Sequence, residues 1–83
     1  MYNERKLVEI KHVRDLGAQI RNRRKEVGLT ADEVAASAGV SRRLLLELEL
    51  GKRAKVGFSN VLSILEILGM RIRVTPRGLP GTG

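Results

Sequence analysis

The sequence contains no cysteine, which excludes disulfide bonds and thiolate metal sites. Aromatic side chains are scarce, with one Tyr and one Phe in 83 residues. The sequence therefore has too few aromatic residues to form the stacking surfaces that bind single-stranded nucleic acids. No apolar run is long enough to cross a bilayer, and no signal-peptide pattern opens the sequence. We therefore expect a cytoplasmic protein with no membrane partner.

Residues suited to catalysis are also few. His12 is the one histidine, and its polar surroundings favour a plain surface position. Asp32 and Glu33 suit the start of a helix better than an acid–base pair. Glu47 and Glu49 are two residues apart, so they point to different sides of a helix. Because neither a metal-ligand cluster nor a phosphate-binding loop is visible, we expect no enzyme, no cofactor and no metal.

Positive charge is what the sequence has in excess. It holds 16 Lys and Arg residues against 9 Asp and Glu residues, a formal net charge of +7. Such a balance favours nucleic acid or an acidic surface as a partner, although a basic surface also keeps a protein in solution. The 83 residues suffice for one small domain with a modest core.

Two short helices that meet at a tight turn are predicted between Thr30 and Gly51. Thr30 and Glu33 have the spacing of a capping box at the start of the first helix. Gly39 can end that helix in the left-handed conformation that glycine adopts at little cost. Ser41 can then cap the second helix, which ends at Gly51. The combined spacing favours a helix-turn-helix over a simple helical hairpin.

Further elements are predicted on both sides of this pair. Apolar residues recur with helical spacing over Val13–Val27, and Gly28 is the expected end of that helix. Residues 1–12 mix charged and apolar side chains, so they form either a short strand or an N-terminal arm. Ser59 can cap a last helix over residues 60–68.

The C-terminal part of the sequence predicts contact with a second chain. Apolar residues surround the last helix on most sides, so it needs burial on more than one side. Residues 70–75 alternate as in a strand, and a lone strand needs a backbone partner. That partner is the segment around Leu7–Ile10 or, as we favour, the same strand of a second subunit; the two do not exclude each other. Residues 76–83 are expected to form a flexible tail. The predicted dimer interface consists of Val61, Ile64, Leu65, Leu68, Met70, Ile72 and Val74.

A family resemblance is carried by the run from Leu16 to Lys52, LGAQIRNRRKEVGLTADEVAASAGVSRRLLLELELGK. It resembles the XRE family of phage-repressor-like helix-turn-helix domains. The last helix, followed by LGMRIRV, is similar to the ending of HipB-type antitoxins. Dimers of those antitoxins share a small sheet that is made from the C-terminal strand of each subunit.

The resemblance covers roughly residues 13–75 and implies the fold. We expect an all-α protein of four to five helices, with a helix-turn-helix DNA-binding domain over residues 13–69. A short β-strand over residues 70–75 would pair across a homodimer.

The resemblance also implies roles for single residues. Arg42 and Arg43 would lie at the major groove, where a guanidinium can fork onto guanine or clamp a phosphate. Glu47 would either accept a hydrogen bond from a cytosine amino group or be a solvated or arginine-paired carboxylate. Arg24 and Glu49 match a structural salt bridge of the family. The DNA-binding set implied in this way is Ser41, Arg42, Arg43, Leu46, Glu47, Lys52, Arg53 and Lys55.

The sequence departs from the family pattern at three positions. Ala31 replaces a usual glutamine, which removes a side-chain contact to phosphate, although the backbone amides of the helix start can still bind one. Leu46 and Leu50 stand where small, polar or basic residues are usual. Leu46 can contact a thymine methyl group, or the change indicates an altered DNA surface or a protein interface.

The function that the resemblance implies is a homodimeric repressor that binds double-stranded DNA at a palindromic operator, with half-site centres roughly 34 Å apart. Within that class, it predicts the antitoxin of a HipBA-like type II toxin–antitoxin system, which autoregulates its operon and neutralises a kinase-like toxin. The alternatives are a free-standing XRE-family regulator and a protein-interaction module with weak DNA binding.

Overall fold

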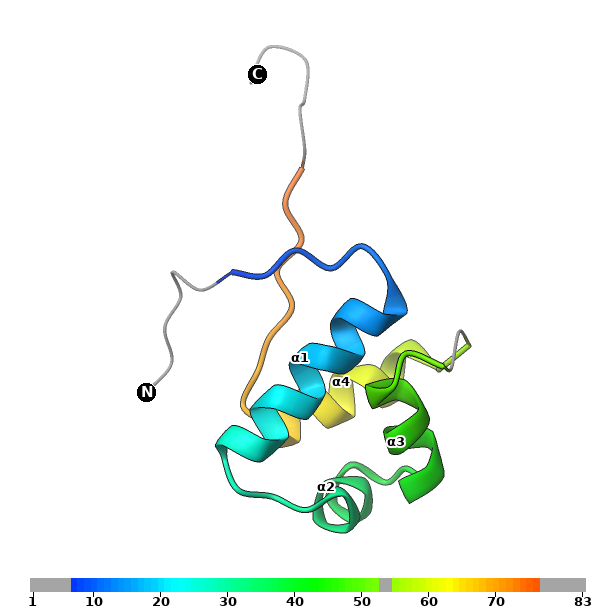
Figure 1. Cartoon of the computed structure of the whole chain (residues 1–83). Coiled ribbons are helices and arrows are strands. Elements are labelled where there is room, and N and C mark those ends of the chain that lie inside the picture. Colours follow the sequence, from blue (N-terminus) through cyan, green and yellow to red (C-terminus); the bar gives the residue numbers. More distant parts are fainter. Residues whose placement is uncertain (1–6, 53–54, 77–83) are drawn as a thin grey trace.

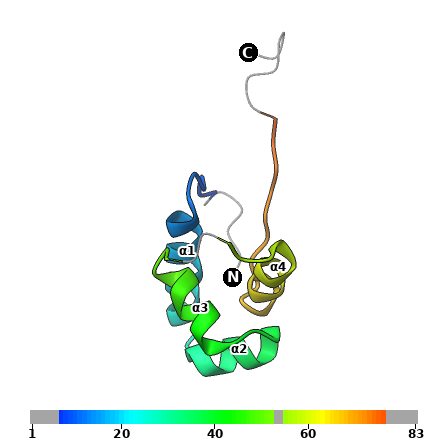
Figure 2. The same ribbon diagram turned by 90° about the vertical axis from the view of Figure 1, so that its right-hand side faces the viewer.

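A computed structural model describes residues 7–52 and 55–76 of the chain. These residues form four helices, α1 (Val13–Glu26), α2 (Ala31–Ala38), α3 (Arg42–Glu49) and α4 (Phe58–Ile67) (Figure 1). Figure 2 shows α1 and α3 together on one side, α4 on the other, and α2 across one end. The expected all-α architecture is confirmed. None of the helices in the described ranges is long and apolar enough to cross a membrane.

One core lies between the four helices, and every helix contributes to it. Small side chains on α2 allow its neighbours to approach, since Ala35 is buried beside the larger Val34. α2 contacts both α3 and α4, and α1 contacts α3. The domain is thus held by apolar contacts that all four helices share. The buried apolar residues are Ile20, Val34, Ala35, Leu45, Leu48, Val61, Ile64, Leu65 and Leu68.

The caps around the predicted turn are confirmed. The Glu33 backbone N–H donates to Thr30 Oγ1 (3.1 Å), and the Thr30 N–H donates to Glu33 Oε1 (2.8 Å). The backbone N–H of Thr30, which donates to the carboxylate, and in second place the Thr30 side chain lower the pKa of the Glu33 carboxyl group. Gly39 ends α2 in the left-handed region (φ 72°), and Ser41 Oγ accepts from the Leu44 N–H (3.0 Å). Local sequence alone therefore sets the geometry of the turn.

The start of α1 is fixed by an acidic side chain. Asp15 Oδ2 accepts hydrogen bonds from the backbone N–H groups of Lys11 and His12, each 3.0 Å long. These two bonds lower the pKa of Asp15, because they favour its charged form. His12 is the exposed residue just before the helix, as its surroundings in the sequence indicate. The helix ends at Glu26, one residue before the predicted end at Val27.

The predicted cap of the last helix is wrong. α4 begins at Phe58 rather than at residue 60, its N-cap is Gly57, and Ser59 lies inside the first turn. The Gly57 carbonyl oxygen accepts hydrogen bonds from Asn60 (3.0 Å) and Val61 (3.2 Å), which closes the first turn two residues early. Glycine is an acceptable N-cap, so the serine is not needed there.

The predicted strand over residues 70–75 is not formed within this chain. The described residues contain no strand, and residues 70–76 follow an extended course that first runs beside α4 and then continues beyond the helices (Figures 1 and 2). Residues 7–11 form no strand either and do not pair with them. The physical reason is that a strand requires a backbone partner, and the described part of one chain supplies none. Residues 1–6 and most of the predicted tail, 77–83, lie outside the described residues.

Four of the residues that the sequence predicts at a dimer interface are core residues of the single chain. Their prediction as dimer contacts is therefore corrected. Val61, Ile64, Leu65 and Leu68 are at most 4% exposed. They are buried because α4 packs on α2, so their burial requires no second chain. The apolar residues that α4 leaves exposed are Phe58, Leu62 and Ile67.

Candidate nucleic-acid interface

The inner face of α3 packs tightly on α1. Leu45 and Leu48 are completely buried there. A Cβ atom built on Gly17 of α1 would lie 1.9 Å from the Leu48 carbonyl oxygen, so only glycine allows the two helices to come this close. Glycine costs roughly 0.5–1 kcal/mol in a helix relative to alanine, and here the close packing offsets that cost. One side of α3 is thereby fixed, and the other side faces outward.

An ion pair ties α1 to α3 at a second point. Arg24 Nε lies 2.7 Å from Glu49 Oε2, and Arg24 Nη2 lies 2.8 Å from Glu49 Oε1. Arg24 Nη1 also donates to the Leu29 carbonyl oxygen (3.2 Å). The hydrogen bonds to Glu49 raise the pKa of Arg24. The salt bridge expected from the family resemblance is confirmed, and its two-pronged geometry fixes the orientation of α3.

Two arginine side chains project from the outer face of α3. The side chains of Arg42 and Arg43 are 64% and 85% exposed. Arg42 Nε lies 3.0 Å from Oδ1 of Asp32 on α2, and Arg43 Nε donates to Glu47 Oε2 at 3.3 Å. Of the two interpretations of Glu47, the arginine-paired carboxylate is the one seen in this structure. Ser41, exposed just before them, serves as the helix cap.

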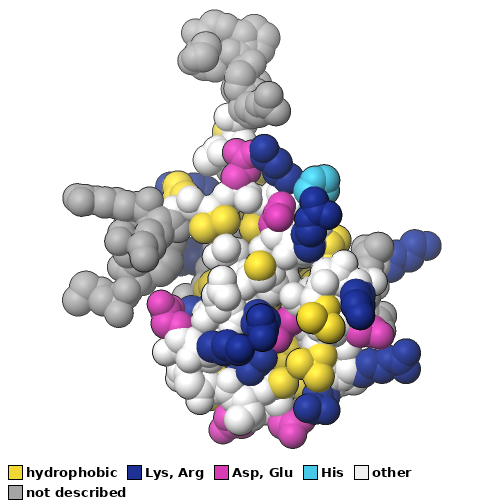
Figure 3. All heavy atoms as spheres, in the orientation of Figure 1, with side chains coloured by type: hydrophobic (Ala, Val, Ile, Leu, Met, Phe, Trp, Pro, Cys, Tyr) yellow, Lys and Arg dark blue, Asp and Glu magenta, His cyan; other side chains and the backbone are white. Residues whose placement is uncertain are grey.

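Apolar side chains accompany the arginines. Leu50 is 63% exposed and Leu46 is partly exposed. Figure 3 shows basic and apolar side chains side by side over the part of the surface that α3 forms. Ala31, in place of the usual glutamine, is partly buried and packs against the core. The outer surface of α3 can therefore offer both hydrogen-bond donors and apolar contacts.

Gly51, the first residue of the basic loop after α3, lies beside the start of α1. Gly51 adopts a left-handed conformation (φ 71°), and a Cβ there would lie 2.5 Å from Arg14 Cβ. Lys52 and Lys55 are exposed, and neither forms an ion pair within the described ranges. Arg53, the other predicted phosphate contact of this loop, lies outside the described residues. The two lysines therefore place exposed positive charge next to α3, and their contact with phosphate stays a prediction.

The sequence prediction missed the roles of two residues, one on this surface and one in the packing behind it. Asp32 was interpreted only as a helix-start acid, and its partner Arg42 becomes visible once the turn brings α2 against α3. Gly17 has no assigned role in the sequence, but it interrupts the apolar stripe of α1 near Leu16 and Ile20. A glycine within such a stripe is a usable signal of a close helix crossing.

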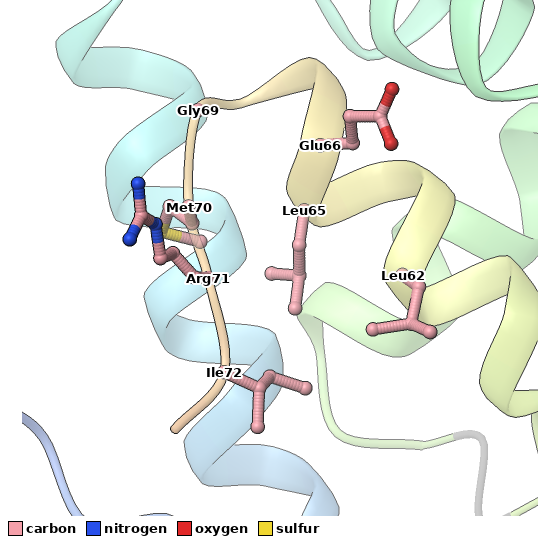
Figure 4. Close-up of a pocket in the computed structure, with 7 residues that line it drawn as sticks. All are labelled: Leu62, Leu65, Glu66, Gly69, Met70, Arg71 and Ile72. Atoms are coloured by element: carbon pink, nitrogen blue, oxygen red, sulfur yellow. The ribbon is translucent and has the colours of Figure 1, made fainter.

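The remaining predicted dimer contacts follow α4. Met70 is partly buried against the core, whereas Ile72 is 43% and Val74 89% exposed. Figure 4 shows the groove between α4 and this segment, with Leu62 and Ile72 on opposite sides of it. The groove is lined by Leu62, Leu65, Glu66, Gly69, Met70, Arg71 and Ile72.

A family model described as a helix-turn-helix domain matches residues 15–74. The chain belongs to the XRE-like helix-turn-helix family. An uncharacterised HTH-type transcriptional regulator, y4mF of Sinorhizobium fredii, is 43% identical to this helix-turn-helix protein over 70 residues, which are 83% of this chain and 90% of the relative. The chain is therefore a member of the helix-turn-helix family of transcriptional regulators.

A solved structure supports the same assignment of this helix-turn-helix protein. The crystal structure of the restriction-modification controller protein C.AhdI from Aeromonas hydrophila matches with a TM-score of 0.66 at 25% sequence identity. The match covers 71% of this chain and 88% of the controller protein. Neither relative's name mentions a toxin–antitoxin system, so the narrower assignment to HipB-type antitoxins stays a prediction.

Proposed function

We propose that this helix-turn-helix protein is a homodimeric, sequence-specific repressor that binds double-stranded DNA through α3. The observation that carries the proposal is the outward face of α3, where Arg42 and Arg43 are exposed on a helix that is fixed from behind by Arg24–Glu49 and by Gly17. A helix held in this way can enter a major groove without rearrangement. The protein acts by binding, in the cytoplasm, and not as an enzyme.

Phosphate contacts come from the basic loop in this proposal. Lys52 and Lys55 are point charges beside α3, and Arg53 belongs to the same loop by sequence. Such contacts release counterions, so they supply much of the affinity and make it depend steeply on salt. Base contacts from α3 then select the site.

The C-terminal segment joins the two copies. Residues 70–75 are extended, and Ile72 and Val74 expose apolar side chains. Pairing of this segment with its copy would satisfy its backbone groups and cover Ile72, Val74 and the neighbouring Leu62 of α4. A two-fold dimer presents two copies of α3 to a palindromic operator, with half-site centres about 34 Å apart.

A DNA-binding experiment tests the proposal. A duplex from the promoter of the protein's own gene is titrated at two salt concentrations, with a scrambled duplex beside it. We expect preference for the promoter and a steep loss of affinity with salt. Arg42→Ala combined with Arg43→Ala should abolish the preference, whereas the matched Arg42→Lys and Arg43→Lys pair should retain affinity for the scrambled duplex. Equal binding of both duplexes by the wild type would contradict the proposal.

The antitoxin role is the narrower form of this proposal. It is supported by the similarity of the LGMRIRV ending to HipB-type antitoxins, and the exposed Leu50 offers a contact for a kinase-like toxin. The similarity to a restriction-modification controller protein supports a free-standing regulator instead. Co-expression with any kinase-like protein encoded by the neighbouring gene separates the two. A stable complex that inhibits the kinase supports the antitoxin, and absence of such a gene or complex supports the free-standing regulator.

A further inference from the structure

Each of the two arginines on the outer face of α3 is held by a carboxylate at its Nε atom. Asp32 Oδ1 lies 3.0 Å from Arg42 Nε, and Glu47 Oε2 lies 3.3 Å from Arg43 Nε. Asp32 comes from α2 and Glu47 from the next turn of α3, so two separate elements supply the same arrangement. In both cases the side of the guanidinium nearest the backbone is occupied.

This arrangement leaves the outer edge of each guanidinium available. Within residues 7–52 and 55–76, the terminal Nη nitrogens of Arg42 and Arg43 form no hydrogen bond. Those two nitrogens are parallel donors, and they match the O6 and N7 acceptors of guanine in the major groove. A guanidinium that is held at Nε loses less rotational freedom when it forms that pair of bonds.

The carboxylates also change which group on DNA the two arginines bind best. A phosphate carries a full negative charge, so a carboxylate beside the guanidinium repels it. The edge of guanine is neutral, and the paired arginine still offers both of its donors to it. Lys52 and Lys55 have no ion-pair partner in the described part of the chain, so they remain the better phosphate ligands. The charges on this surface therefore separate base readers from phosphate binders.

We propose that Arg42 and Arg43 each read a guanine in every operator half-site, and that Asp32 and Glu47 are positioning residues that hold the two guanidinium groups for this purpose. The inference rests on the proposed function, because it assumes that α3 lies in the major groove. It adds the chemical identity of the bases that are read and assigns Asp32 a role in reading them.

Selection from a random duplex library tests the inference, since it requires no known operator. The full-length wild type is used beside five single variants. Arg42→Lys and Arg43→Lys keep the charge but lose the planar fork of donors, whereas Asp32→Asn and Glu47→Gln remove one carboxylate charge each. The matched control is Glu9→Gln, because Glu9 forms an exposed ion pair with Lys11 (3.4 Å) away from α3 and its loss changes the net charge equally.

We expect the wild type to enrich two guanines in each half-site. Each Arg→Lys variant should lower the preference for one of them by about 10- to 100-fold, the range of a good bidentate base contact. Asp32→Asn should lower the preference for the guanine that Arg42→Lys affects, and Glu47→Gln should lower the preference for the guanine that Arg43→Lys affects. Each of these two changes should be about two- to fivefold, as fits an exposed ion pair. Glu9→Gln should leave the base preference unchanged. Replacing those guanines by 7-deazaguanine should reduce wild-type affinity more than that of the corresponding lysine variant, because a lysine ammonium lacks the planar fork that engages N7 and O6 together.

Three results overturn the inference. Asp32→Asn and Glu47→Gln variants that behave like Glu9→Gln would show that the carboxylates position nothing. A Glu47→Gln variant that changes the preference at a G·C pair other than the one affected by Arg43→Lys would show that Glu47 reads a base directly. If the wild type enriches no sequence at all, the proposed function fails together with the inference, whereas the first two results leave sequence-specific binding intact.

Discussion

Arg24 Nε and Nη2 donate to the two carboxylate oxygens of Glu49, and this ion pair links α1 to α3. The side chains of Arg24 and Glu49 are 13% and 2% exposed, and both carboxylate oxygens are engaged. Solvent is therefore largely excluded from the pair, and each charge depends on the other for its partner. This contact helps to fix the position of the opposite, outer face of α3, which carries Arg42 and Arg43.

Loss of either partner of this pair should destabilise the domain. We expect Arg24→Ala to lower the free energy of unfolding by about 3 kcal/mol, because it leaves the buried Glu49 carboxylate without its partner. Urea denaturation measures the change. Glu26→Ala is the matched control, since the Arg23–Glu26 pair has the same 2.7 Å distance but is far more exposed; it should cost about 0.5 kcal/mol or less. Equal losses for the two variants would contradict the structural role of Arg24.

Gly17→Ala should destabilise the protein although alanine is the better helix former. Helix propensity alone would add about 1 kcal/mol of stability. The new Cβ would overlap the Leu48 carbonyl oxygen, a backbone atom that cannot rotate away, so α1 and α3 must separate. We expect a net loss of about 1–3 kcal/mol in urea denaturation. Ala18→Gly on the exposed side of α1 isolates the propensity effect, and a stabilised Gly17→Ala variant would show that the helices are not so close.

The capping carboxylates predict how stability depends on pH. The folded-state pKa values of Asp15 and Glu33 lie below their ordinary values of 3.8 and 4.5, because backbone hydrogen bonds favour the charged forms. A lowered folded-state pKa gives stability that is present above the unfolded pKa and lost as pH falls through the folded pKa. We therefore expect the stability advantage of the wild type over Glu33→Gln to shrink from pH 6 to pH 3. An advantage that stays constant over this range would contradict the prediction.

The sequence predicted the elements that local chemistry determines. The Thr30–Glu33 capping box, the left-handed Gly39 and the Ser41 cap depend on residues within a few positions of each other, so their spacing was sufficient. The Ser59 cap failed because Gly57 offered an equally local start two residues earlier. Contacts between helices were harder to foresee. The Arg24–Glu49 pair was found through family resemblance, whereas the Asp32–Arg42 contact depends on the angle between α2 and α3.

The same limit explains the correction to the dimer interface. A helix with apolar residues on most sides predicts burial, but periodicity does not say which side meets its own domain and which meets another chain. The structure assigns Ile64 and Leu65 to the core and leaves Leu62 and Ile67 exposed. The expectation of a second chain therefore now depends on the exposed apolar residues of α4 and of residues 70–75.

Charged substitutions in the C-terminal segment should separate the dimer without unfolding the chain. Ile72 and Val74 are exposed in the single chain, so Ile72→Asp and Val74→Asp have little effect on its core. In the proposed dimer they would bury four aspartates near the two-fold axis, two from each chain, which is strongly unfavourable. We expect analytical ultracentrifugation to show a dimer for the wild type and a monomer for the double variant, with unchanged circular dichroism. Ser63→Asp, on the exposed side of α4, is the control that should stay dimeric. A wild type that sediments as a monomer at every concentration tested would refute the proposed assembly.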